Sequence, residues 1–414
     1  TVQTRDLEAE GDDAFHLRTL DDLCAFRNMV NDGWTFSGET VVLEADIDMS
    51  GLKLPWVTIG NSDFTFAGSF DGHGKKIVNL TFVGDSENVG GLFRNLDVGS
   101  EVRNLMFVGA DISGYNAAAL ATYAYSGSVI DGVVVDPTSK ISATSYAAGV
   151  IARVSYGDMY NCWNYADVES DFIAAGIAGY IYGEDADRSQ MTNCVNKAAK
   201  IVGVDRAGGI VAHANYADVS WCCNTATVEQ VSGSMPAGGI VAVGSMKAVI
   251  SYCLNVGPVK SGSANVNASA GGILGQDPSG SPGATTKFCD NWGDVTASQF
   301  SAGGVVMSVY GTTVSHCRNS GTVNGAVTAD GISAKPAFGS SSSSYSVVDA
   351  AVAGGTTTYR FSSVTPTSGY YYDGDTLKTV SGTETTAADA VAALNAAANE
   401  AIDFWVVGED GRVH

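Results

Sequence analysis

The sequence lacks several features that would place it in a large class of proteins. No run of about 18 apolar residues is free of glycine and polar breaks, so we expect no transmembrane span. Basic residues are few, since 22 lysines and arginines stand against 44 aspartates and glutamates, for a formal net charge of −22. A chain this acidic, with no basic stripe, binds nucleic acid poorly and is repelled by anionic membranes. We therefore expect no nucleic-acid partner and no insertion into a membrane.

Motifs of the common enzyme and metal sites are also missing. The chain has no Cys-x-x-Cys, Gly-x-Ser-x-Gly, His-Glu-x-x-His or phosphate-binding loop. The five histidines are scattered, at His16, His73, His213, His316 and His414. The sequence therefore predicts no metal site, no cofactor and no catalytic residue of these classes.

What the sequence does contain is a repeat of about 30 residues. Six copies of Cys-x-Asn begin at Cys162, Cys194, Cys222, Cys253, Cys289 and Cys317, in steps of 32, 28, 31, 36 and 28 residues. A second motif of small residues followed by Ile or Val, such as Ala207-Gly208-Gly209-Ile210, keeps step with the first. Each repeat holds three short apolar runs and shows no helical period. This layout predicts an all-β fold, a right-handed parallel β-helix whose coils bury their apolar faces against one another.

Alternation along the strands predicts which positions face inward. They are the Ile or Val after the glycines, the Cys of Cys-x-Asn, and the Val of Asn-x-Gly-x-Val. The Asn can hydrogen-bond to its own turn and to the Asn residues of the coils above and below. The glycines permit a tight bend or a close backbone approach at one corner of the coil.

The eight cysteines are even in number, which leaves a disulfide framework open. Stacked strands lie about 4.7–4.9 Å apart, which a disulfide could span, but in-register side chains point the same way rather than toward each other. One cysteine per coil at constant phase therefore favours a ladder of reduced thiols. Cys223, beside Cys222, is expected to face outward.

The two ends differ from the repeats. Apolar residues at helical spacing over residues 17–31, followed by Gly33, predict an amphipathic helix that covers the open edge of the first coil. Residues 387–402 are Ala-rich and predict a second helix. We expect an N-terminal cap at residues 1–38, a β-helix at 39–338, and C-terminal coils with a cap at 339–414. Because the chain begins at Thr1 and stops straight after an apparent strand and turn, we expect a monomeric segment of a longer protein.

The opening coils carry four further motifs in order: DIDMSG at 46–51, WVTIG at 56–60, FAGSFDGHGKKI at 66–77 and GGLF at 90–93. Together with the later repeats, they make the chain resemble GLUG-motif proteins over roughly residues 17–335. The final glycine of the motif is kept at Gly179 and Gly275 and replaced in other repeats, for example by Ala212. The resemblance implies a non-catalytic β-helix in an extracellular bacterial surface protein, as in adhesin-like proteins and regions attached to IgA-cleaving peptidases.

Outward aromatic residues are the candidate ligand-binding surface. Tyr156, Tyr182, Tyr216 and Tyr310 fall six or seven residues after the second small residue of their repeats, so stacking would align them along one edge. Trp163, Tyr165 and Trp292 occupy outward positions around Cys-x-Asn. Flat apolar rings of this kind bind sugars or protein partners, so host or microbial glycans or glycoproteins are the expected partners. The alternative is that loops cover the rings, or that the tyrosines only stabilise their turns.

Parallel β-helices can also host polysaccharide hydrolases and lyases, which need converging carboxylates. Asp167 and Glu169 flank an inward Val168, and Asp185 lies in an acidic inserted loop. These residues predict either a glycosidase pair or a calcium site, or simply a solvated acidic surface. The sequence favours a non-catalytic adhesion or stalk module with ligand-binding capacity, and a carbohydrate-active enzyme is the alternative.

Overall fold

The structure is a computed structural model. It describes residues 7–9, 14–84, 89–265, 268–278, 283–309, 312–332, 346–348, 352–353, 357–359, 370–373, 375–379, 381–398, 406–407 and 412–413. The chain forms two compact units, Thr1–Asp218 with Thr225–Thr227, and Val219–Asn224 with Val228–His414. Both units are stretches of parallel β-solenoid, about 10 turns in all, with a small helix in each end region. The predicted all-β parallel β-helix is therefore confirmed.

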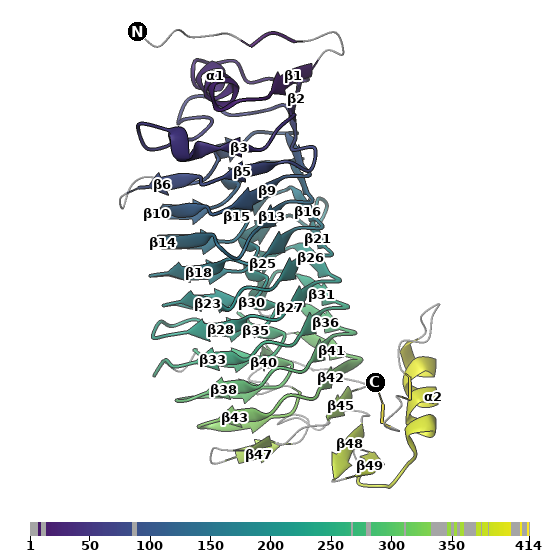
Figure 1. The fold of residues 1–414 in the computed structure, drawn as a ribbon. Helices are drawn as coiled ribbons and strands as arrows, with labels where there is room; N and C mark the ends of the chain where they lie inside the picture. Colours follow the sequence, from purple (N-terminus) through teal and green to yellow (C-terminus); the bar gives the residue numbers. More distant parts are fainter. Residues whose placement is uncertain are drawn as a thin grey trace. The chain divides into compact units, whose positions relative to one another are not determined.

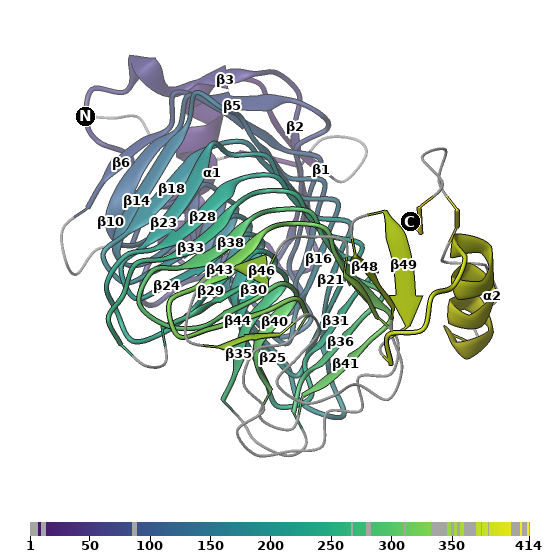
Figure 2. The ribbon, with the colours of Figure 1, turned by 90° about the horizontal axis from the view of Figure 1, so that it is seen from below.

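Each coil passes through four sheets, which we name A, B, D and C in the order in which the chain meets them. One coil of the first unit runs through β16 (Asp158–Tyr160), β17 (Trp163–Asn164), β18 (Asp167–Ser170), β19 (Ile173–Ala175) and β20 (Ala178–Tyr182). β18 and β19 both belong to sheet D. Figure 1 shows the corresponding strands of successive coils stacked on one another within a unit, and Figure 2 shows β10, β14 and β18 side by side.

The remaining strands of the first unit repeat this pattern. Sheet A also contains β1 (Ala14–Leu17), β2 (Thr40–Leu43), β4 (Ser69–Asp71), β8 (Glu101–Arg103), β12 (Val129–Asp131) and β21 (Ser189–Thr192). Sheet B contains β3 (Ile47–Asp48), β5 (Lys76–Val78), β9 (Met106–Val108), β13 (Val134–Val135) and β22 (Val195–Asn196). Sheet C contains β7 (Phe93–Leu96), β11 (Ala121–Ala124), β15 (Ile151–Ser155) and β25 (Val211–Asn215). Sheet D contains β6 (Thr81–Val83), β10 (Asp111–Ala118), β14 (Lys140–Ala148), β23 (Lys200–Gly203) and β24 (Arg206–Gly208).

The second unit has strands of the same four kinds. Those of sheet A are β31 (Val249–Ser251), β36 (Thr285–Lys287) and β41 (Thr313–Ser315). Those of sheet B are β27 (Cys223–Asn224), β32 (Leu254–Asn255), β37 (Asp290–Asn291), β42 (Cys317–Asn319), β45 (Ser346–Val348), β48 (Tyr370–Asp373) and β49 (Thr376–Thr379). Those of sheet C are β30 (Val241–Ser245), β35 (Leu274–Asp277) and β40 (Val306–Val309). Those of sheet D are β29 (Ala237–Gly238), β33 (Val259–Ser261), β34 (Ala270–Gly271), β38 (Val295–Ala297), β39 (Ala302–Gly303), β43 (Val323–Gly325), β44 (Thr328–Asp330), β46 (Val352–Ala353) and β47 (Thr357–Tyr359). β26 (Ala217–Ser220) and β28 (Thr227–Gln230) contain the boundaries between the units.

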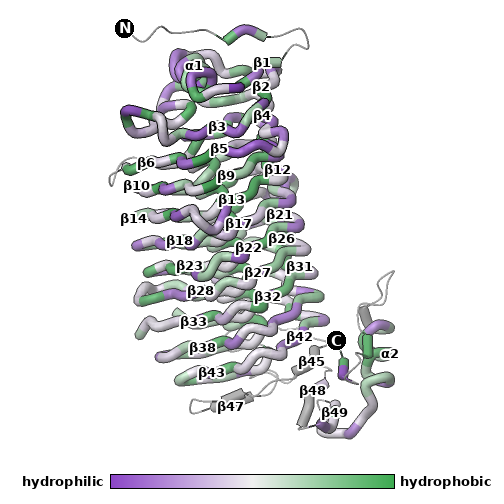
Figure 3. Tube along the Cα trace, viewed as in Figure 1, coloured by the Kyte–Doolittle hydropathy of each residue, from purple (hydrophilic) through white to green (hydrophobic). Residues whose placement is uncertain are grey.

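Burial confirms the predicted inward positions. The Ile or Val after the glycines is 0% exposed in all six repeats, and the six cysteines of Cys-x-Asn are at most 2% exposed. The Val at the end of each Asn-x-Gly-x-Val unit, such as Val259, is also 0% exposed. Along single strands, buried and exposed residues alternate, as in β14, where Ile141 is buried between exposed Lys140 and Ser142. Figure 3 shows hydrophilic and hydrophobic residues interspersed along the tube.

Each coil contains more strands than the three predicted, because the Cys-x-Asn segment forms a short strand of its own. The strand is brief because the residue before each cysteine has a left-handed backbone, with φ between +52° and +57°. These residues are Asn161, Asn193, Trp221, Tyr252, Phe288 and His316. Asn adopts this conformation readily, whereas aromatic residues rarely do. In the second unit, ring stacking offsets that strain, with centroid distances of 4.6 Å for Trp221–Tyr252 and 5.0 Å for Tyr252–Phe288.

The buried asparagines form the predicted amide ladder. Asn164 Nδ2 donates to Asn196 Oδ1 at 3.0 Å in the first unit, and Asn255 Nδ2 donates to Asn291 Oδ1 at 2.7 Å in the second. The same amide group also closes its own turn, since Asn255 Nδ2 lies 2.9 Å from the carbonyl oxygen of Gly257. Each amide is therefore bonded both within its coil and to the next one, which fixes the register of stacking.

The N-terminal helix, α1 (Leu20–Asn31), begins three residues later than predicted. Leu17 instead pairs with Leu43 between β1 and β2. A capping box sets the start of the helix: the Thr19 hydroxyl accepts from the Asp22 N–H at 3.1 Å, and the Asp22 carboxylate accepts from the Thr19 N–H at 3.0 Å.

The apolar face of α1 covers the first coils, as expected of a cap. Phe26 is 0% exposed. Its ring lies edge-on to Phe36 at 5.0 Å and to Phe66 at 5.5 Å, and it packs within 6.4 Å of Phe93. Burying these four rings together closes the open end of the core of the first unit.

The second helix, α2 (Ala387–Ala398), matches the start of the predicted one, and the residues from 399 to 405 lie outside the described part of the chain. Ala390 and Leu394 pack against Leu377 and Val413. No helix in the described residues is long and apolar enough to cross a membrane. The predicted domain boundaries near residues 38 and 338 remain predictions.

None of the eight cysteines forms a disulfide, so the thiol ladder is confirmed. The buried thiols donate to the carbonyl oxygen two residues earlier, as from Cys289 Sγ to Lys287 at 3.3 Å. Burial, and then hydrogen bonds with the thiols of Cys253 and Cys317, raises the pKa of Cys289. A buried thiol with a raised pKa is a poor nucleophile. Cys223 is half-buried and faces away from the core, as predicted.

Candidate functional site

A column of aromatic and basic side chains crosses the outer face of sheet C in the first unit. The strand register places Tyr123 (β11), Arg153 (β15), Tyr180 (β20) and His213 (β25) beside one another in consecutive coils. The next residue along each strand, such as Val154, is 0% exposed and faces the core. Alternation therefore directs these four side chains outward. We call them the sheet C column.

Arg153 lies between the two tyrosine rings of the column. Its Cζ is 5.3 Å from the ring centroid of Tyr123 and 4.9 Å from that of Tyr180, within the range of cation–π attraction. The ring of Tyr180 meets the imidazole of His213 edge-on at 4.6 Å, and the Tyr123 hydroxyl is 3.0 Å from Ser155 Oγ. The Arg153 side chain is exposed, while the two tyrosines and His213 are half-buried. The column thus holds two half-buried tyrosine rings and one exposed cation on a rigid sheet.

His213 is held neutral at physiological pH by its surroundings. Arg206, which is 7% exposed, donates from Nη1 to His213 Nδ1 at 3.0 Å. Burial, and then the charges of Arg206 and Arg153, lowers the pKa of His213 to about 3. Burial also lowers the pKa of Arg206, which nevertheless stays protonated because the pKa of a guanidinium is above 12 in water.

Acidification is expected to destabilise the first unit through His213. The unfolded side chain takes up a proton near pH 6.5, whereas the folded one does so only near pH 3. The unfolded state therefore binds more protons between these values, and stability falls as the pH drops, by up to about 1.4 kcal/mol per pH unit. Urea unfolding of the wild type and of His213→Gln at several pH values between 7 and 4 measures the effect. As the pH falls, the free energy of unfolding should decrease more in the wild type than in His213→Gln. A difference between the two that does not change with pH would contradict the lowered pKa of His213.

The structure brings the tyrosines that were predicted to align along one edge only partly together. The rings of Tyr156 and Tyr182 pack at right angles, 5.1 Å apart, and the Tyr156 hydroxyl donates to Glu184 Oε1 at 2.6 Å. That hydrogen bond raises the pKa of Tyr156. Tyr156 and Tyr216 are turn residues with positive φ, whereas Tyr182 is the last residue of β20 and is in register with Ser155. The three tyrosines therefore occupy two neighbouring columns rather than one.

The other predicted aromatic residues lie elsewhere. Trp163 in β17 and Tyr165 just after it are on sheet B of the first unit, with ring centroids 6.2 Å apart, and Lys197 Nζ lies 5.0 Å from the Trp163 ring. Trp292 belongs to the second unit and is 49% exposed. Tyr310 lies outside the described residues.

Two of the candidate carboxylates, Asp167 and Glu169, point outward from β18 as predicted, on either side of buried Val168. Each is engaged by the next coil. Asp167 Oδ1 accepts from the backbone N–H groups of Ala199 and Lys200, both at 3.0 Å, and Glu169 forms an ion pair with the Lys200 ammonium. These contacts are those expected of carboxylates that join neighbouring coils.

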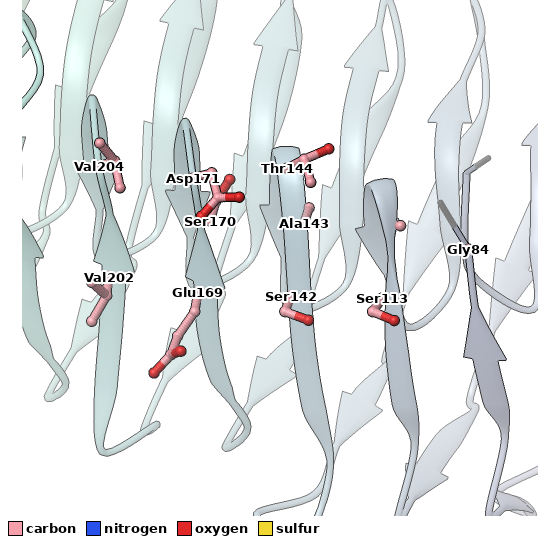
Figure 4. A pocket seen from close by; sticks show the side chains of 11 residues that line it. Gly84, Ser113, Ser142, Ala143, Thr144, Glu169, Ser170, Asp171, Val202 and Val204 are labelled. Carbon is pink, nitrogen blue, oxygen red and sulfur yellow. The ribbon is translucent and has the colours of Figure 1, made fainter. Parts of the chain in front are cut away.

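Glu169 also lines an open depression of about 410 Å³ on sheet D of the first unit (Figure 4). Its lining residues are Gly84, Ser113, Gly114, Ser142, Ala143, Thr144, Glu169, Ser170, Asp171, Val202 and Val204. The second carboxylate here is Asp171, two residues further along the chain. Asp185 is exposed in the loop between β20 and β21, between sheets C and A, so it is not part of this depression. In the described part of the chain, no group of three His, Cys, Asp or Glu side chains is placed to hold a metal ion.

The sheet C column was not predicted as a site, although the sequence contains a signal for it. Its members are the fourth residues after the second small residue of their repeats: Arg153 after Gly149, Tyr180 after Gly176, and His213 after Gly209. This position does not stand out as aromatic, because its residue type changes from coil to coil between tyrosine, arginine and histidine.

No model of a protein family matches this chain, and the search of curated proteins found no match. Among solved structures, the chain is similar to one described as a "putative immunoglobulin A1 protease" from Bacteroides ovatus. The two are 17% identical, the match covers 98% of this chain and 93% of that chain, and the TM-score is 0.41. A similarity at this level supports no inference about function. The resemblance to GLUG-motif proteins remains a prediction.

Proposed function

We propose that this chain is a non-catalytic, extracellular β-helix module of a bacterial surface protein, and that it binds glycans through the sheet C column. The observation that supports binding is the arrangement of Tyr123, Arg153, Tyr180 and His213 in consecutive coils. Aromatic rings offer flat apolar faces against which sugar rings can pack, and polar groups between them fix orientation. Since the column is built on paired strands, its geometry is set before a ligand arrives.

The experiment is an incubation of the purified chain with immobilised host and microbial glycans and glycoproteins, scored for retention and for cleavage products. Tyr180→Ala should weaken retention about tenfold, since removing a central aromatic contact costs about 1–2 kcal/mol. Tyr115→Ala is the matched control, because Tyr115 is 43% exposed on β10 of sheet D in the same unit. Equal binding by both variants would refute the sheet C column as the binding surface, provided that both melt at the temperature of the wild type.

A carbohydrate-active enzyme is the second candidate, and the placement of Glu169 and Asp171 in one depression is the observation that favours it. Hydrolases and lyases need paired carboxylates within reach of the same bond. The ion pair between Glu169 and Lys200 weighs against this role, because it holds that carboxylate against the next coil. If the same incubation released soluble products and Glu169→Gln abolished that release, the chain would be an enzyme rather than a binding module.

A further inference from the structure

We infer that the glycan bound by the sheet C column is acidic, and that Arg153 holds its carboxylate or sulfate group. This inference rests on the proposed function and adds the chemical class of the ligand. Its basis is the exposed guanidinium of Arg153, which carries five N–H donors.

The donors of Arg153 are not used within the part of the chain that the structure describes. The side chain is exposed, and within that part of the chain it contacts the rings of Tyr123 and Tyr180 by cation–π attraction, at 5.3 Å and 4.9 Å. Neither contact consumes an N–H donor. The rings hold the guanidinium from two sides, so it meets a ligand already oriented.

Two other exposed cations of the first unit are paired with carboxylates. Arg103 pairs with Glu101, and Lys200 pairs with Glu169. With 44 acidic residues against 22 basic ones, a carboxylate partner is easily found on this surface. Arg153 is instead held between two rings, and no described carboxylate is paired with it.

Two carboxylates of this region are bonded to neutral donors instead. Asp97 accepts from the Thr65 hydroxyl at 2.5 Å and from the Val98 N–H at 2.7 Å. Glu184 accepts from the Tyr156 hydroxyl at 2.6 Å. These bonds direct both carboxylates toward other partners and leave the positive charge of Arg153 for a ligand.

The neighbours of Arg153 also suit an anion. His213 is neutral, and the buried guanidinium of Arg206, which donates to His213 Nδ1, adds a second positive charge next to this end of the column. A guanidinium binds a carboxylate or sulfate through two parallel hydrogen bonds, and a sugar ring attached to that anion would lie over a neighbouring tyrosine. The column thus matches an acidic sugar better than a neutral one.

The test compares matched saccharides by titration calorimetry. The probes are an oligogalacturonate, the same oligomer after reduction of its carboxyl groups, and a neutral oligosaccharide before and after sulfation. The wild type should bind an acidic member about 10- to 100-fold more tightly than its neutral counterpart, as expected for charge-assisted hydrogen bonds. Arg153→Gln should remove this preference. Arg103→Gln changes the net charge equally and should keep it.

The outcomes separate the inference from the function on which it rests. Preference for the oligogalacturonate identifies a carboxylate, and preference for the sulfated oligomer alone identifies a sulfate; either supports the inference. Equal binding of acidic and neutral members, or a preference that survives in Arg153→Gln, overturns it but leaves a glycan-binding module. Absence of binding to any saccharide overturns the proposed function as well. If Arg153→Gln unfolds, Arg153→Lys, which keeps the charge but loses the planar fork, should show an intermediate preference.

Discussion

Replacement of Asn255 by alanine is expected to destabilise the second unit by about 3–5 kcal/mol. The side chain is 0% exposed and makes three hydrogen bonds. Its Nδ2 donates to Asn291 Oδ1 and to the Gly257 carbonyl, and its Oδ1 accepts from Asn224 Nδ2 at 2.8 Å. Truncation removes a partner from three buried polar groups at once, and each such loss costs about 1–3 kcal/mol. Because the ladder continues through the stack, the loss weakens the coil above and the coil below.

Asn324→Ala is the matched control, since Asn324 is an exposed residue of β43 in the same unit and should change stability by less than about 0.5 kcal/mol. Urea unfolding followed by circular dichroism measures both variants. Hydrogen exchange of the β32 and β37 amides shows whether the loss is local, as expected when each repeat contacts only its neighbours. If Asn255→Ala lowered the free energy of unfolding no more than the control, water or a backbone rearrangement would have to satisfy the three groups that lose their partner.

Replacement of Gly239 by alanine is expected to cost about 3 kcal/mol or more. A Cβ at this position would lie 2.0 Å from the carbonyl oxygen of Gly272 and 2.5 Å from Cγ of Asn255. Neither atom can withdraw easily, because one belongs to the backbone of the next coil and the other to the amide ladder. Overpacking of a rigid core costs about 1–3 kcal/mol, and a clash with the backbone places this case at the upper end or beyond.

Gly51→Ala serves as the control for the Gly239 variant, because the added Cβ would meet only Leu20 Cδ2, at an ordinary 3.5 Å. Thermal unfolding of the two variants beside the wild type measures the difference. If Gly239→Ala were as stable as Gly51→Ala, the close approach of successive coils at this corner would have to be looser than the structure shows.

The candidate site was less predictable than the fold. The spacing predicts that Tyr156, Tyr182 and Tyr216 align along one edge, but the structure places them in two neighbouring columns. The difference arises because one residue more or less before a turn moves a side chain to another column. Tyr182 and Tyr156 illustrate this, since they are equivalent in approximate spacing but not in register.

The repeat alone determined that the chain stacks as a parallel β-helix with buried Cys, Asn and Ile or Val positions. Each of these residues has the same neighbours in every coil, so periodicity carries the information. Only the tertiary structure decided that Arg153 lies between Tyr123 and Tyr180 and that Asp171, rather than Asp185, joins Glu169. These juxtapositions depend on the exact register of strands about 30 residues apart in the sequence. Insertions and turns set that register, and a one-residue shift along a strand turns a side chain to its opposite face.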